Sequence, residues 1–296
     1  MLQKGGAPKD IIDLYTYTNA TESTTVPSKM SALYMVLTNA RASAFSEDTV
    51  EGRILGGNDK LPKTFAKKLG SKIKYNRALK RLKFNDKGVT AIVNKNGVNE
   101  SIKALKCVIA IPASVLKNVD IEPGFSSDKT YCIQNQDYGH VMKVAMQYQK
   151  RFWDQKQSIG QRVFTDTRLR RVYHFSIDQP GPRGILLTFT SGEDAKKLGR
   201  LSEERRMRVA QETCENIWPE SSQYWENGIT KYWNEDPWVK ASYSIAGVGQ
   251  KGFRDILAKP EGPIYFAGEH TAFYRASMNG AIESGLRAKS ELIQTL

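Results

Sequence analysis

The feature that most constrains this chain is the stretch GPIYFAGEHTAFYRASMNGAIESGL, residues 262–286, close to its end. Residues 264–267 form a short apolar run typical of a buried strand, and Gly268 permits a tight turn after it. The residues that follow predict a helix with one face of small side chains, made of Ala281, Ser284, Gly285 and Ala288. This small face would let the helix lie close to the strand or to a flat ligand.

The turn between this strand and helix has the elements of a binding site. A helix N-terminus presents free backbone N–H groups and the positive end of its dipole, which suits an anionic or carbonyl-bearing ligand. Glu269 in the turn could accept hydrogen bonds from sugar-like hydroxyls. The alternative is an ordinary strand–turn–helix with a surface acid, and the residues alone leave both interpretations open.

Strands and helices alternate along the rest of the chain. A helix through residues 65–69 should stop at Gly70, and Ser202 should cap another that ends before Pro219. An Asn96-Gly97 turn predicts a hairpin over residues 88–104. Further strands are expected at 72–84, 106–112, 141–153, 171–177 and 184–192, with 106–112 buried on both faces. The predicted fold class is α/β, or α+β with a mixed sheet.

The net charge of +13 raises the hypothesis of a nucleic-acid or anionic-surface partner. The basic residues occur in short clusters with apolar or acidic neighbours, which favours solvated faces and no nucleic-acid partner. The three cysteines lack metal-type spacing, which predicts isolated thiols and no metal site. No apolar run has membrane-spanning length and no signal peptide is visible, so we expect a soluble protein of unknown compartment without a membrane partner.

Two segments of the chain carry a family resemblance. GEHT (residues 268–271) and GAIESGLRA (280–288) resemble the C-terminal flavin-binding signature of flavin-containing amine oxidases, a superfamily with monoamine, polyamine and L-amino-acid oxidases. GGNDKLPKTFAKKLG, CVIAIPASVLKNVDIEPGF and YGHVMKVAMQYQKRFW resemble other segments of the family in the right order. TDTRLRRVYHF with GILLTFTSGEDA is similar to the L-amino-acid-oxidase branch in particular. The resemblance covers roughly residues 50–296.

The resemblance implies a partial FAD-binding Rossmann-like domain and an amine-oxidase substrate domain. It assigns residues 1–52 and 126–236 to the substrate domain, and 53–125 and 237–296 to the FAD-binding domain. The family's N-terminal Gly-x-Gly-x-x-Gly unit is not found in this sequence. The expectation is therefore the C-terminal part of an oxidase, either truncated, processed or split into subunits, and inactive alone. A separate N-terminal subunit or a second copy of the chain is the protein partner considered.

The resemblance also implies a reaction. FAD takes a hydride from the carbon beside the nitrogen of an amine or L-amino acid, and the imine hydrolyses to a carbonyl compound and ammonia. Dioxygen then reoxidises the flavin and gives hydrogen peroxide. Lys143 matches the lysine that holds a water against the reactive nitrogen of the flavin, and a lysine that leans into solvent is the alternative. Ser242 stands where monoamine oxidases have a flavin-bonded cysteine, which implies non-covalent FAD.

The remaining site residues are carried over from the family's motifs. The expected FAD contacts are Leu79, Trp233, Gly268, Glu269, Met278 and Ala281. The expected substrate contacts are Tyr173, Phe189, Tyr243, Ala276 and Ser277. Trp238 is expected to be a buried core aromatic.

Two departures from the family's pattern leave the substrate open. The amino-acid-oxidase branch often has a carboxylate-holding tyrosine where this chain has Phe189. Ala276 and Ser277 are small, as in the polyamine-oxidase and histone-demethylase branch, and leave room for a bulkier substrate. A non-catalytic remnant or subunit, and a basic binding protein with an inert oxidase fold, are the other hypotheses considered.

Overall fold

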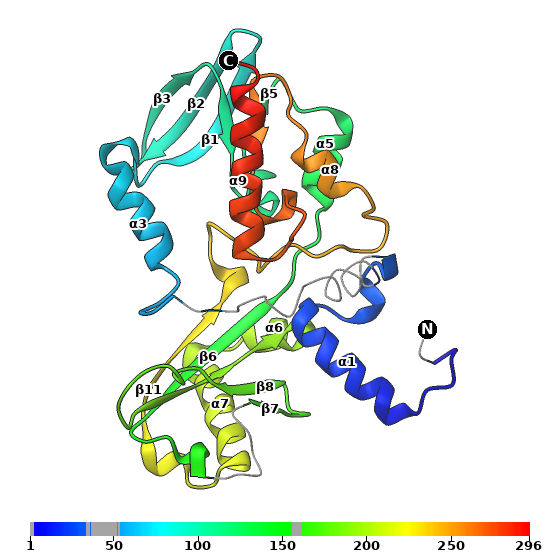
Figure 1. The fold of residues 1–296 in the computed structure, drawn as a ribbon, viewed down its shortest axis with the longest axis vertical. Helices are drawn as coiled ribbons and strands as arrows, with labels where there is room; N and C mark the ends of the chain where they lie inside the picture. Colours follow the sequence, from blue (N-terminus) through cyan, green and yellow to red (C-terminus); the bar gives the residue numbers. More distant parts are fainter. Residues whose placement is uncertain (1–2, 34–35, 37–51, 53, 156–161) are drawn as a thin grey trace.

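The computed structural model describes residues 3–33, 36, 52, 54–155 and 162–296. Figure 1 shows two halves, an upper one with β1 to β5 and α9 and a lower one with β6 to β11 and α7. The chain crosses between them where residues 137–141 run into β6 and where β11 leads toward α8. Helices and mixed sheets are interleaved, which confirms the predicted fold class.

The upper half contains a four-stranded sheet in the order β3-β2-β1-β5. Its strands are β1 (Ala78–Asn85), β2 (Gly88–Lys95), β3 (Val98–Ala104) and β5 (Asp120–Glu122). Asn96 and Gly97 have φ of 49° and 89°, as a two-residue hairpin turn requires, so the predicted hairpin is confirmed. Leu82 of β1 is fully buried, and it packs the sheet against the core beneath it.

A second, parallel sheet of the upper half contains only two strands, β4 (Cys107–Ile109) and β12 (Ile264–Phe266). α9 (Met278–Ile293) packs on β12, and α4 (Ala113–Leu116), α5 (Ser127–Asn135) and α8 (Phe253–Ala258) surround the pair. The prediction that the β4 segment is buried on both faces was wrong, since Val108 is 41% exposed. Among the described elements, only β12 pairs with β4.

The small face expected on α9 is only partly buried. Ser284 and Ala288 are buried, and the Ser284 hydroxyl accepts a hydrogen bond from the Gly268 N–H at 2.9 Å, which fixes the helix on the turn after β12. Ala281 and Gly285 are exposed. The helical period places all four small residues within about 100° of arc, so Ala281 and Gly285 form the exposed edge of the same face.

The lower half is a six-stranded antiparallel sheet with helices on one face. The strands are β6 (Val141–Tyr148), β7 (Arg162–Phe164), β8 (Arg171–His174), β9 (Gly184–Thr188), β10 (Thr190–Ser191) and β11 (Trp225–Tyr232). The order is β10-β6-β9-β8-β7, and β11 pairs with the other edge of β6. α6 (Gly192–Gly199) and α7 (Glu203–Ile217) pack on this sheet.

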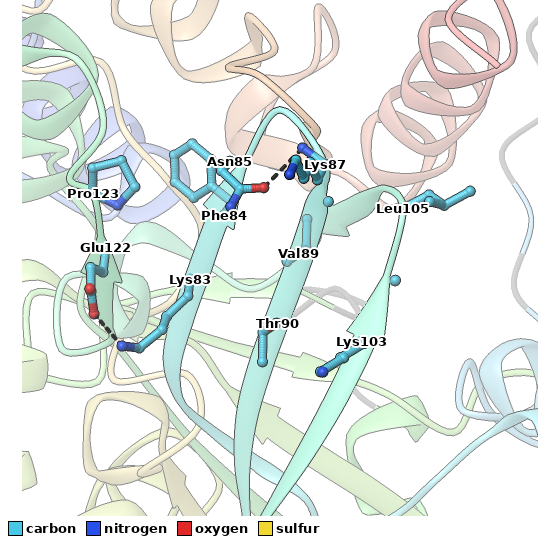
Figure 2. A pocket seen from close by; sticks show the side chains of 12 residues that line it. Lys83, Phe84, Asn85, Lys87, Val89, Thr90, Lys103, Leu105, Glu122 and Pro123 are labelled. Atoms are coloured by element: carbon cyan, nitrogen blue, oxygen red, sulfur yellow. Dashed lines mark hydrogen bonds and ion pairs between the residues drawn. The ribbon is translucent and has the colours of Figure 1, made fainter.

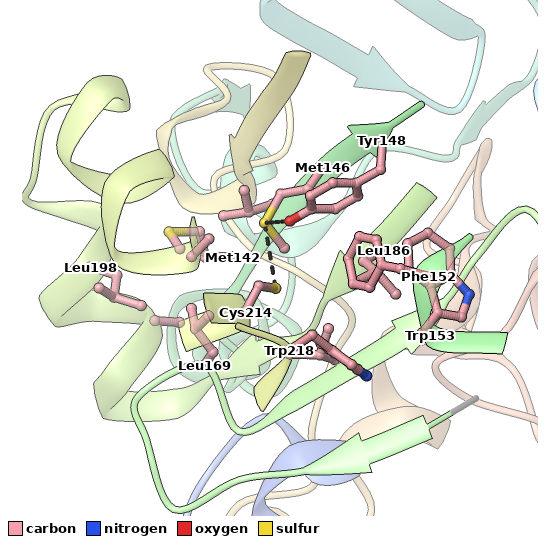
Figure 3. Close-up of a cluster of buried hydrophobic side chains, with 14 residues drawn as sticks. Met142, Met146, Tyr148, Phe152, Trp153, Leu169, Leu186, Leu198, Cys214 and Trp218 are labelled. Carbon is pink, nitrogen blue, oxygen red and sulfur yellow. Dashed lines mark hydrogen bonds between the residues drawn. The ribbon is translucent and has the colours of Figure 1, made fainter. Parts of the chain in front are cut away.

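One continuous core joins these helices to the sheet. Figure 3 shows Met142, Met146 and Tyr148 of β6 together with Cys214 of α7 and Trp218. α7 begins at the predicted cap, where the Ser202 hydroxyl accepts from the Arg205 N–H. Its residues Ala210 and Cys214 are buried, which confirms the helical spacing seen in the sequence.

Two further helices lie beside this framework (Figure 1). α1 (Lys9–Ser23) contacts β10, and α3 (Lys60–Leu69) ends at Gly70, whose φ of 55° confirms the predicted stop. Residues 30–37, an amphipathic stretch of the sequence, lie partly outside the described residues. In the described ranges no helix combines the length and the apolar character needed to cross a bilayer.

Candidate active site

The six-stranded sheet has a second face, opposite the core of Figure 3, and the predicted catalytic lysine lies on it. Met142, Val144 and Met146 of β6 point into the core. Side chains alternate along a strand, so Lys143 and Ala145 point the other way, and both are half-buried.

A row of side chains crosses this second face through Lys143. Met142 pairs with Thr190 and Ala145 with Leu187, a register that places Phe189 opposite Lys143. On the far side of Phe189 lies Arg171 of β8, whose backbone oxygen accepts from the Phe189 N–H at 3.0 Å. The Lys143 Nζ is 5.2 Å from the centre of the Phe189 ring, and the Arg171 Cζ is 4.9 Å from the same ring. Two cations therefore flank one aromatic ring.

Aromatic rings continue the row beyond Arg171. Its guanidinium carbon lies 5.3 Å from the Tyr173 ring and 6.0 Å from the Phe164 ring, and the residue is 8% exposed. Tyr173 is two residues further along β8 and pairs with Leu187, so it shares the face. The structure thus brings together three predicted site residues, Lys143, Tyr173 and Phe189, from three strands.

Arg171 is the residue of this row that the sequence analysis missed. In RLRRVYH it reads as one of several surface basic residues. Its spacing of two from Tyr173, in a segment expected to be a strand, was the available signal, because residues i and i+2 share a face.

The electrostatics of the row are dominated by its two cations. Burial lowers the pKa of Lys143, and the positive charge of Arg171 lowers it further. Desolvation and a like charge both penalise the ammonium form. An anion or a polar ligand placed between the two groups would relieve that cost.

The turn after β12 is held together by Glu269. One carboxylate oxygen accepts from the Ser244 N–H at 2.9 Å, and the other accepts from the Ser244 hydroxyl and the Ala276 N–H, both at 2.8 Å. Gly268 has a φ of 122° and Ala276 a φ of 60°, so the backbone is unusual at both ends of this loop. Glu269 therefore already uses three of its acceptor sites within the chain.

α9 begins beside this loop. The Ser277 hydroxyl accepts from the Gly280 N–H at 2.9 Å and caps the helix. A Cβ at Gly280 would stand 1.8 Å from the backbone oxygen of Tyr274, so only glycine allows the close approach. Met278 and Ala281 are exposed in the first turn, where a ligand at the helix N-terminus could contact them.

Tyr243 lies on the linker that connects the two halves. The Gly139 N–H donates to the backbone carbonyl oxygen of Tyr243, and the Ser242 N–H donates to the backbone carbonyl oxygen of Gly139, each at 3.1 Å. Glu269 holds the next residue, Ser244, and Gly139 leads directly into β6. The linker therefore ties the loop before α9 to the strand of Lys143.

Comparison with known proteins agrees with the resemblance seen in the sequence. The family described as flavin containing amine oxidoreductase matches residues 10–293. The chain belongs to this family. The flavin-dependent L-tryptophan oxidase RebO of Lentzea aerocolonigenes is 30% identical over 80% of this chain and 51% of its own length. The L-amino-acid oxidase of Siganus canaliculatus is 27% identical over 81% of this chain and 47% of its own length.

Solved structures show the same fold. The putrescine oxidase structure with bound putrescine has a TM-score of 0.83 at 22% identity, over 94% of this chain and 64% of that one. Cyclohexylamine oxidase from Brevibacterium oxydans IH-35A has a TM-score of 0.84 at 17% identity, over 97% and 65%. The chain spans about half the length of the curated relatives it matches.

Family membership confirms the predicted class of cofactor, FAD, and the residues near Ser242 fit it. The hydroxyls of Ser242 and Thr24 are buried, and no described residue hydrogen-bonds to them. Both lie within 2.7 Å of the point where a Cβ on Gly139 would stand, so a side chain at this position would collide with them. A buried serine hydroxyl can donate to a flavin heteroatom but cannot form the cysteine bond, which agrees with non-covalent FAD.

The other predicted site residues lie further apart. Leu79 is in β1 of the upper half, packed against its core. Trp233 follows β11, and the Lys231 Nζ lies 4.9 Å from its ring. The expectation that Trp238 is a core aromatic was wrong, since 68% of it is exposed in the turn after Asp236.

A pocket among the described residues lies elsewhere. Figure 2 shows it at one end of the upper sheet, about 700 Å³, with the Lys83 Nζ paired to Glu122 at 2.7 Å and the Lys87 N–H donating to Asn85. None of the predicted site residues lines it. Within the described ranges, no group of three or more His, Cys, Asp or Glu side chains is placed to hold a metal ion.

Proposed function

We propose that the protein is an FAD-dependent oxidase of the C–N bond of an amine or L-amino acid. The products would be an imine, which hydrolyses to a carbonyl compound and ammonia, and hydrogen peroxide from dioxygen. The observation that carries this proposal is the row of Lys143, Phe189 and Tyr173 on one sheet face, in a chain of the flavin amine oxidoreductase family.

Bound FAD would supply the redox chemistry by accepting a hydride from the carbon beside the nitrogen. The residues proposed to hold it are Leu79, Trp233, Gly268, Glu269, Met278 and Ala281. Glu269 would act mainly through the loop that it fixes, because its carboxylate already bonds to Ser244 and Ala276. Ser242 would contribute its buried hydroxyl.

Lys143 is proposed to hold a water at the reacting centre. A half-buried ammonium is a fixed donor, and in a poorly solvated site its charge is worth more than in bulk water. It would stabilise negative charge that develops on dioxygen during reoxidation. Its lowered pKa fits this role, because a less strongly held proton can also be passed on.

The aromatic side chains are proposed to orient the substrate. Phe189, Tyr173 and Tyr243 would form flat walls against which the amine is held, with Ala276 and Ser277 leaving room beside them. Aromatic faces also attract a protonated amine. Binding would thus place the α-carbon while excluding water from it.

The test is anaerobic reduction. The natural protein, saturated with FAD, is mixed without oxygen with a panel of L-amino acids and primary amines, and the flavin absorbance band is followed. At least one substrate should bleach the band, and admission of air should restore it with one peroxide per turnover. No bleaching by any member of the panel would contradict the proposal.

A polyamine- or demethylase-like substrate is the second candidate. It is favoured by the small residues Ala276 and Ser277, and a possible lysine-specific histone demethylase 1 of Drosophila melanogaster is 28% identical over 73% of this chain. The same panel, extended with spermidine and a methyl-lysine peptide, distinguishes the candidates.

A third candidate is that this chain works as one part of an assembly, with a separate N-terminal subunit or a second copy. It is favoured by exposed apolar side chains on α9, namely Met278, Ile282 and Leu286. The molar mass of the natural protein in solution, measured by light scattering, would show a partner or exclude one.

A further inference from the structure

We propose that the pocket of Figure 2 is a second ligand site, which binds a small organic phosphate independently of the oxidase chemistry. The first argument is the distribution of charge. Residues 54–106 form α3, β1, β2 and β3 with the short segments between them, and they contain fourteen lysines and arginines against three acidic residues, a net charge of +11. The rest of the chain contributes only +2 to the total of +13. The positive field is therefore concentrated on this part of the upper half, where it attracts anions.

The second argument is the charge of the pocket itself. The pocket has a volume of about 700 Å³ and is lined by Lys83, Lys87 and Lys103, with Glu122 as the one acidic residue among the described residues that line it. Glu122 is already paired with the Lys83 Nζ at 2.7 Å. The ammonium groups of Lys87 and Lys103 form no ion pair with any residue that the structure describes, so two positive charges at the pocket are not balanced.

The third argument is the strand register, which places the polar side chains in one row. Lys83 of β1 pairs with Thr90 of β2, and Thr90 pairs with Lys103 of β3. Directly paired residues point to the same face of a sheet, and Figure 2 shows Thr90 between the two lysines. Neighbouring strands are about 4.8 Å apart, which a lysine side chain can span. A phosphate over Thr90 can therefore accept from the Thr90 hydroxyl and from the Lys103 ammonium group together.

The rest of the lining indicates that the ligand also has an apolar part. Leu105 is 72% exposed, and Leu105 and Pro123 add apolar surface on opposite sides of the lysine row (Figure 2). Lys87, in the turn between β1 and β2, brings a further ammonium group from the end of the sheet. The volume is in the range of pockets that hold small organic ligands. An organic phosphate would bury its apolar part against these side chains, which a bare phosphate ion could not do.

The pocket is remote from the turn proposed to contact FAD. Leu105 lies shortly before β4, and Gly268 lies shortly after β12. Because β4 and β12 are parallel, the pocket lies near their amino ends and the Gly268 turn lies near their carboxyl ends. A phosphate in the pocket is therefore not the pyrophosphate of the cofactor, and both ligands can bind at the same time.

The test is titration calorimetry of the natural protein with phenyl phosphate at constant ionic strength, with and without added FAD. The affinity should be the same in both conditions. Lys103→Met should weaken binding at least about 10-fold, because a charge-assisted hydrogen bond is lost, and Thr90→Val should weaken it about threefold. Lys95→Met is the matched control, because Lys95 is an exposed lysine at the other end of β2 and does not line the pocket. It removes the same charge and should change the affinity less than about twofold.

Lys103→Arg keeps the charge and should stay within about threefold of the wild type, which shows that the loss in Lys103→Met is due to charge and not to misfolding. Inorganic phosphate should bind at least about 10-fold more weakly than phenyl phosphate, and equal affinities would overturn the organic ligand. Absence of phenyl phosphate binding, or its displacement by FAD, would overturn the second site.

A general attraction of anions to the charged face is the remaining alternative. In that case Lys95→Met and Lys103→Met would weaken phenyl phosphate equally, and the pocket would have no role. A short DNA duplex that binds more tightly than phenyl phosphate, and depends equally on Lys95 and Lys103, would make this face a nucleic-acid surface and overturn the proposal. None of these results depends on oxidase activity, so the two proposals can fail separately.

Discussion

The two halves of the molecule bury their apolar side chains to different degrees. In the lower half, one face of the sheet and α7 enclose a continuous core in which Met142, Val144 and Leu198 have no exposed surface. In the upper half the core is split into two clusters, and Val108 on β4 and Leu286 on α9 remain exposed. A parallel strand pair normally has both faces covered.

Because of this difference, we expect the stability of the fold and the binding of the cofactor to depend on different halves of the molecule. The lower half has the buried area to stabilise its own sheet, and it carries Lys143, Phe189 and Arg171. The upper half presents α9 and the turn after β12, which hold most of the residues proposed to contact FAD, and it still has uncovered apolar surface. We therefore expect substitutions in the lower core to act on stability, and those at the joint between the halves to act on function.

The largest effect should come from the lower core. Leu186→Ala removes a side chain that is 1% exposed and should lower the free energy of unfolding by about 2–5 kcal/mol, through lost burial and a residual cavity. Leu286→Ala is the matched control, because Leu286 is 60% exposed, and it should change stability by less than about 0.5 kcal/mol. Urea unfolding measures both. Comparable losses would show that α9 is covered by something outside the described residues.

The next effect concerns chemistry on the sheet face. Lys143→Met keeps the length of the side chain and removes its charge, and reoxidation of the reduced flavin by dioxygen should slow about 10²–10³-fold. Flavin reduction under anaerobic conditions should change much less. Stopped-flow absorbance separates the two half-reactions. Lys231→Met is the control, since Lys231 pairs with Lys143 in register but forms an ion pair with Asp236. If neither half-reaction changes in Lys143→Met, Lys143 has lost its proposed role.

A smaller effect is expected where Glu269 joins the halves. Glu269→Ala leaves the N–H groups of Ser244 and Ala276 without their acceptor, which should cost about 1–3 kcal/mol. Amide hydrogen exchange at these two residues should rise before global unfolding. Glu261→Ala is the comparison, because Glu261 accepts from the Ser126 N–H in an exposed position where water can replace it. Unchanged exchange at Ser244 would show that the loop holds without Glu269.

A feature could be predicted from the sequence when the residues that determine it lie close together in the chain. The Asn96-Gly97 turn, the Ser202 cap and the stop at Gly70 depend on residues a few positions apart, and all three are found as expected. The exposure of Val108 and Trp238 depends on which elements pack against them, and both expectations failed.

The same distinction applies to the site. Lys143, Phe189 and Tyr173 were named from motifs, but motifs do not show that they form one row. That row depends on the pairing of β6, β9 and β8, which is not local in sequence. Arg171 was missed for this reason: its neighbours in the chain are basic, and its neighbours in space are aromatic.

The smallest effect concerns a cation buried in the upper half. Lys129 is 1% exposed, its Nζ donates to the backbone oxygens of Leu257 and Lys259, and it lies 3.7 Å from the centre of the Phe266 ring. These contacts favour the charged form, but burial outweighs them and lowers the pKa of Lys129 to about 8. The unfolded chain, with a pKa near 10.5, then binds more protons between pH 8 and 10.5.

Stability should therefore rise with pH through that window, by at most about 1.4 kcal/mol per pH unit from this group. Lys129→Met should remove the rise, while Lys259→Met, at an exposed position of the same turn, should leave it. Urea unfolding at pH 8, 9 and 10 measures the slope. If the wild type and Lys129→Met have the same slope, the carbonyl oxygens and the ring keep Lys129 charged in the folded state. The core of the upper half would then hold a buried charge through the contacts of Lys129 alone. It would resemble the lower core more closely than the exposed residues of β4 and α9 suggest.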